Sequence, residues 1–85
     1  MQREPLSSEL DALWRRLWEE WQDNDEEDVV LDTGKLDEIE AGIPALAGRV
    51  KTALAYLQRA HYIQYRSGVG DEGIEPILYD VYEPR

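Results

Sequence analysis

The sequence contains no cysteine, only one histidine and no long apolar run. Without cysteine the chain has no disulfide, no thiolate metal ligand and no cysteine nucleophile. The single histidine, His61, leaves too few groups for a histidine metal site or a Ser–His catalytic pair. No apolar segment approaches the roughly 18 residues of a membrane span, and no signal peptide is recognisable. These absences predict a cytoplasmic, soluble, non-enzymatic protein that needs no metal and no cofactor.

Basic residues are also scarce. The 85-residue chain, long enough for one domain with a small core, has 9 Lys and Arg against 19 Asp and Glu, a net charge of −10. Acid-rich, lysine-poor compositions are typical of salt-adapted (halophilic) proteins, because hydrated carboxylates keep a protein soluble where charges are screened. An ordinary acidic protein has the same composition, so both interpretations stay open. At first sight −10 argues against a nucleic-acid partner.

The charges are unevenly distributed along the chain. Residues 1–40 carry fourteen acids and four bases, residues 41–70 carry four bases and no acid, and residues 71–85 carry five acids and one base. The three segments therefore have charges of −10, +4 and −4. An acid-free stretch of this length in so acidic a chain predicts a basic surface on an otherwise acidic body.

Two segments have the composition of ligand loops but lack the necessary spacing. The acidic run from Asp23 to Asp28 has neither the central Gly nor the closing Glu of a calcium loop, so it predicts a solvated loop. The Gly-rich segment at residues 68–73 leads from one strand-like run into another rather than into a helix. It therefore does not fit a phosphate-binding loop.

The first helix is expected at residues 7–22, with Ser7 or Ser8 as its N-cap. Apolar residues recur along it at steps of three and four, which gives a wide apolar stripe. Two interpretations of this stripe stay open. Either all of it packs in the core, or part of it binds a second copy or another partner through Leu10, Trp14, Trp18 and Trp21.

The rest of the chain predicts a mixture of helices and strands. Thr33 is expected to cap the second helix, and Pro44 to lie in the first turn of the third. A Gly-rich turn between two strand-like runs indicates a C-terminal β-hairpin. The expected elements are a strand at 29–31, helices at 33–42 and 45–60, and a hairpin at 61–82.

This order of elements resembles the winged helix-turn-helix family over residues 29–82. Five residues match the apolar positions of that family's pattern: Ile39, Val50, Leu54, Leu57 and Ile63. The segment Pro44-Ala45-Leu46 stands at the pattern's tight turn. His61 departs from the pattern, because the family usually has a Gly there, and it is expected to cap the end of the third helix. The resemblance implies an α+β fold with three helices, a short strand and a hairpin wing.

The resemblance also implies a small DNA-binding transcription regulator. In such proteins the third helix enters the major groove of double-stranded DNA and the wing reaches the flanking backbone. Since four bases per chain are few, a homodimer is expected to supply enough phosphate contacts. The candidate DNA-binding residues are Arg49, Lys51, Thr52, Tyr56, Arg59 and Arg66.

Two other functions stay open at this point. An acidic winged-helix module or complex subunit would bind a protein partner and never contact DNA. A DNA mimic would use the acids of the first helix and of the Asp23–Asp28 run to imitate phosphates.

Overall fold

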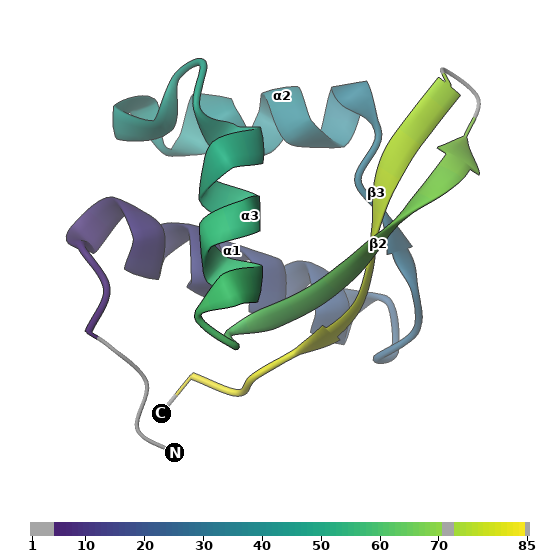
Figure 1. The fold of residues 1–85 in the computed structure, drawn as a ribbon, viewed down its shortest axis with the longest axis horizontal. Helices are drawn as coiled ribbons and strands as arrows, with labels where there is room; N and C mark the ends of the chain where they lie inside the picture. The colour runs from purple at the N-terminus through teal and green to yellow at the C-terminus, as the bar shows by residue number, and fades with distance from the viewer. Residues whose placement is uncertain (1–4, 71–72, 85) are drawn as a thin grey trace.

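A computed structural model describes residues 5–70 and 73–84 as three helices packed beside a small sheet (Figure 1). The helices are α1 (Ser8–Asp23), α2 (Thr33–Gly42) and α3 (Val50–Arg59), with a 3-10 turn, η1 (Pro44–Leu46), before α3. The strands β1 (Val29–Val30), β2 (Ile63–Gly70) and β3 (Gly73–Val81) form an antiparallel sheet in the order β1-β3-β2. This winged-helix-like layout confirms the predicted α+β fold class.

The core lies where the apolar stripes of the helices meet one face of the sheet. Each stripe follows the helical repeat, and the strands contribute alternate residues. All five residues that match the apolar positions of the winged-helix pattern are buried: Ile39, Val50, Leu54, Leu57 and Ile63. The largest fully buried side chains are Leu13, Leu17, Leu31, Ile39, Leu54, Leu57, Ile63 and Leu78.

Trp14 connects α1 to the end of the hairpin. Its indole N–H donates a hydrogen bond to the carbonyl oxygen of Tyr82 at 2.8 Å. Its ring meets Tyr62 edge-on at a centroid distance of 4.7 Å and stacks with Tyr82 at 6.2 Å. Because these contacts join residues far apart in the sequence, Trp14 holds the first helix against the last strand.

The third helix begins later than predicted. The sequence pattern placed it at residues 45–60 with Pro44 in its first turn, but Pro44 begins the separate turn η1, and α3 starts only at Val50. Gly48 lies between them with a φ of 74°, a left-handed conformation that interrupts a right-handed helix. The error arises because an apolar repeat continues through a break made by backbone geometry.

The N-cap of α2 was also predicted one residue too late. The cap is Asp32, whose carboxylate accepts a hydrogen bond from the backbone N–H of Lys35 at 2.8 Å. Thr33, the predicted cap, is the first residue of the helix. Asp is as good a cap as Thr, so the two adjacent candidates could not be separated by residue type.

The helices α1 and α3 end in the same motif, each without glycine. After α3, the N–H of His61 bonds to the carbonyl of Gln58, and the N–H of Tyr62 bonds to that of Leu57. This is the Schellman pattern, in which a residue just past the helix adopts the left-handed conformation. His61, with a φ of 67°, occupies that position, so it ends the helix through its backbone.

We expect the substitution His61→Gly to stabilise the protein by about 1 kcal/mol. A side chain in the left-handed conformation has a steric cost that Gly lacks, although Gly gives back part of the gain through the entropy of the unfolded chain. Urea unfolding followed by circular dichroism measures the difference. A fall in the free energy of unfolding would show that the imidazole makes contacts worth more than the strain.

Candidate nucleic-acid interface

The outward face of α3 carries bases and neutral residues but no acid. Val50, Ala53, Leu54 and Leu57 are buried, which leaves the other side of the helix to solvent. Lys51, Thr52 and Arg59 are exposed, and Tyr56 is partly buried. Thr52 and Arg59 are seven residues apart and therefore share one face, with Lys51 on the adjoining edge. We call the surface formed by the exposed residues Lys51, Thr52 and Arg59 the basic α3 face.

Arg49 lies at the start of this surface rather than on it. It is the N-cap residue of α3, and its guanidinium donates a hydrogen bond back to the carbonyl oxygen of Ala45. The side chain therefore folds over the preceding turn while remaining exposed. The sequence pattern, with a longer helix, predicted Arg49 within the recognition helix.

Arg66 points away from the α3 face. Its neighbour Tyr65 packs against the core, and side chains alternate along a strand, so Arg66 extends from the opposite face of the sheet. There its guanidinium pairs with the Asp28 carboxylate at 3.2 Å, both side chains being more than half exposed. The structure therefore does not bring Arg66 together with Lys51 and Arg59, and its predicted contact with DNA stays a prediction that concerns the wing rather than the α3 face.

Acids of α2 lie beside the start of the basic α3 face. A hollow of about 260 Å³ between α2 and α3 is lined by Asp37 and Glu40 together with Lys51 and Thr52. These carboxylates oppose an anion at that end of α3, because like charges within a Debye length repel. The surface most favourable to phosphate is therefore the part of α3 that leads to Arg59.

Helix α1 offers little apolar surface to a partner. Trp14 and Trp21 are each only 8% exposed, so their rings belong to the core, as the core-packing interpretation predicts. Leu10 and Trp18 are partly buried and pack against the same core. The surface predicted from these four residues as a dimer interface is therefore largely occupied within a single chain.

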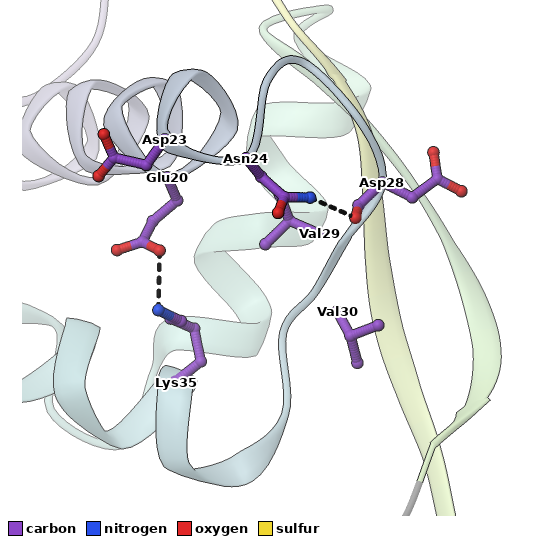
Figure 2. Close-up of a pocket in the computed structure, with 7 residues that line it drawn as sticks. All are labelled: Glu20, Asp23, Asn24, Asp28, Val29, Val30 and Lys35. Carbon is purple, nitrogen blue, oxygen red and sulfur yellow. Dashed lines mark hydrogen bonds and ion pairs between the residues drawn. The ribbon is translucent and has the colours of Figure 1, made fainter.

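A second hollow, of about 410 Å³, lies where α1, β1 and the start of α2 meet. Figure 2 shows Glu20, Asp23 and Asp28 around it, with Val30 at one side and Lys35 opposite. Within residues 5–70 and 73–84, no group of three or more His, Asp or Glu side chains has a geometry that holds a metal. The sequence could not predict this hollow, because its residues come from three elements that meet only in the fold.

An ion-pair network joins α1 to α2 at the edge of this hollow. Glu20 binds Lys35 at 2.8 Å and Arg16 at 3.0 Å, and Arg16 also binds Glu38 at 2.9 Å. Partial burial of Glu20 raises its pKa, but the hydrogen bonds from Lys35 and Arg16 outweigh that effect, so its pKa is lowered. The hydrogen bond to Glu20 correspondingly raises the pKa of Lys35.

We expect Glu20→Gln to destabilise the protein by about 1 to 2 kcal/mol at neutral pH, less than the roughly 1.5 to 3 kcal/mol typical of hydrogen bonds to charged groups because solvent screens the partly exposed partners. Because the folded-state pKa of Glu20 is lowered, its contribution is present above the unfolded pKa of about 4.3 and disappears as pH falls through the folded value. Urea unfolding near neutral and acidic pH should therefore show the two proteins converging in acid. A difference that is the same at both pH values contradicts the assignment.

Comparisons with protein-family models, curated proteins and solved structures found no match for this chain. Its class is therefore defined by its own layout, an α+β domain of winged-helix-like form. Among the described residues, no helix is both long and apolar enough to span a bilayer.

Proposed function

We propose that this protein is a small DNA-binding regulator that places α3 in the major groove of double-stranded DNA. The observation that carries the proposal is the acid-free outer face of α3, with Lys51, Thr52 and Arg59 exposed to solvent. In a chain with 19 acids, an exposed helix face with only basic and neutral side chains is the surface that attracts phosphate.

The dimensions of α3 suit this role. Lys51 and Arg59 are eight residues apart, which corresponds to about 12 Å along the helix axis, similar to the width of the major groove. Two cations at that separation reach phosphates on either side of the groove, while Thr52 and Tyr56 lie between them and face the bases or sugars. Since only a few side chains reach base edges, phosphate contacts dominate the affinity.

Nuclear magnetic resonance mapping tests this placement. On addition of a DNA duplex to the isotope-labelled protein at low salt, we expect the largest amide shifts between Lys51 and Arg59. The outer faces of α1 and α2, which are rich in carboxylates, should shift least. Shifts centred on α1 would contradict the proposed orientation, and an unchanged spectrum would contradict DNA binding itself.

A second candidate function, binding of a basic protein partner, is favoured by the hollow of Figure 2. Its lining combines the carboxylates of Glu20, Asp23 and Asp28 and the ammonium group of Lys35 with the exposed Val30, so a net negative charge lies across the hollow from an apolar side chain. The same titration separates the two functions. A protein that remains folded and does not bind the duplex at low salt favours the protein partner.

A further inference from the structure

Strand β2, the first strand of the hairpin, has an open edge. In the sheet order β1-β3-β2, strand β2 is paired on one side with β3, and no strand of the described chain lies on its other side. At the other margin of the sheet, β1 is only two residues long. The open edge of β2 is therefore the longer of the two, and open edges are templates for pairing with another strand.

The amide of Tyr65 establishes which residues face this edge. Its N–H donates a hydrogen bond to Oε1 of Gln58 on α3 at 2.6 Å, so it points away from β3. In an antiparallel ladder, alternate residues direct their amides towards the same side. Ser67 and Val69 therefore direct their N–H and carbonyl groups to the open edge, beyond the point that Gln58 covers.

Beyond the register irregularity at Gln64 and Tyr65, the edge has few of the features that usually prevent pairing between copies. Strand β2 has no proline, lysine or acid, and its single charge is Arg66. Near its end, Val69 is 89% exposed and its cross-strand neighbour Ile74 is 78% exposed. These are the two most exposed large apolar side chains among the described residues.

The charge distribution favours a second copy of this chain as the occupant. Two bodies of charge −10 repel least where they meet through acid-free segments, and β2 lies within the acid-free stretch 41–70. The strand is also complementary to itself when two copies run antiparallel with Ser67 at the centre. Each Arg66 then lies opposite a glycine, the partner's Gly68, and each Val69 lies beside the partner's Tyr65.

We propose that the protein forms a homodimer by antiparallel pairing of β2 with β2 of a second copy, which makes one continuous sheet. Ser67 exchanges amide hydrogen bonds with its symmetry mate, and the N–H of Val69 reaches the carbonyl of the partner's Tyr65, with Gln58 left in place. The two-fold axis of this pairing is perpendicular to the sheet, so the same face of each sheet points to the same side. The two α3 helices therefore lie on one side of the dimer. The dimer does not depend on DNA binding and is measured without DNA.

Analytical ultracentrifugation of the full chain at low and high salt tests the interface. We expect a dimer of twice 9.9 kDa, and Val69→Lys should raise its dissociation constant about tenfold or more, because a lysine on an edge strand opposes pairing. Ile74→Lys is the matched control, since it makes the same chemical change on the neighbouring strand, away from the edge. It should leave the dimer intact.

A single cysteine tests the register. Because the chain has no cysteine, Ser67→Cys can form only an intermolecular disulfide. In a hydrogen-bonded antiparallel pair the two Cα atoms are about 5.5 Å apart, within disulfide range. Oxidation should therefore cross-link Ser67→Cys readily and the exposed Thr52→Cys control slowly, with Val69→Lys abolishing the difference.

The possible contrary results are distinct from those for DNA binding. A wild-type chain that is monomeric at all concentrations, a dimer unaffected by Val69→Lys, or one lost equally in Ile74→Lys would each overturn the β2 interface. Circular dichroism confirms that each variant is folded. None of these results depends on whether duplex binds α3, so the two proposals fail separately.

Discussion

Replacement of Trp14 by alanine is expected to lower the free energy of unfolding by about 3 to 5 kcal/mol, the usual range for a buried tryptophan. The side chain is 8% exposed, and its loss leaves a cavity between α1 and the hairpin. It also removes the hydrogen bond to the Tyr82 carbonyl and the ring contacts with Tyr62 and Tyr82. Since small domains are stable by only about 5 to 15 kcal/mol, this one change removes much of the total.

Two other variants separate the causes of this loss. Trp14→Phe keeps an aromatic ring but not the N–H donor, so it should have an intermediate effect. Trp18→Ala, on the same helix but only partly buried, should have a smaller effect than Trp14→Ala. Urea denaturation followed by circular dichroism gives all three values. Equal losses at Trp14 and Trp18 would contradict the description of Trp14 as the connection between α1 and β3.

The double substitution Lys51→Ala and Arg59→Ala is expected to weaken duplex binding about a hundredfold, roughly tenfold for each lost phosphate contact. Both side chains are exposed on the basic α3 face, and neither has a core contact whose loss would unfold the helix. Fluorescence anisotropy with a labelled duplex measures the affinity. The fold, checked by circular dichroism, should not change.

The double variant Arg15→Ala and Arg66→Ala is the matched control for this experiment. It removes the same charge, but Arg15 pairs with Asp11 on α1, and Arg66 pairs with Asp28 on the other face of the sheet. We therefore expect its affinity for duplex to remain close to that of the wild type. Equal losses in the two double variants would show that only the overall charge matters and that α3 has no special role.

The sequence could predict the buried side of this fold because burial follows a simple repeat. The five residues that match the apolar positions of the winged-helix pattern are all buried in the structure: Ile39, Val50, Leu54, Leu57 and Ile63. The position of α3 within the acid-free stretch could likewise be read from the sequence. The side of α3 that faces solvent then followed from its apolar stripe.

What the sequence could not predict depends on backbone geometry and on the side of the sheet that a residue faces. The left-handed conformation of Gly48 shortens α3 and moves Arg49 off the helix face. The register of β2 directs Arg66 to the opposite side of the sheet, where it meets Asp28, a residue far away in the sequence. The structure thus separates Arg66 from the α3 residues and places Arg49 just before them, while DNA contact by each of the six residues stays a prediction.

The acidic residues around α3 also give the site a defined electrostatic character. Asp37 and Glu40 line the hollow beside Lys51, whereas no acid belongs to α3. Phosphate is therefore attracted by few cations and repelled by nearby carboxylates, so the fall of affinity with ionic strength should be modest, because it scales with the number of phosphates that are neutralised. If two chains pair through β2, the dimer doubles the number of cations on one side of the molecule.

The salt dependence of duplex affinity tests the central proposal most directly. With two to four cations in contact with phosphate, a plot of log affinity against log salt should be linear with a slope of about −2 to −4. The titration is run with circular dichroism at each salt concentration, so that only folded protein is compared. Absence of duplex binding by the folded protein at the lowest salt, or an affinity independent of salt, would contradict DNA binding through α3.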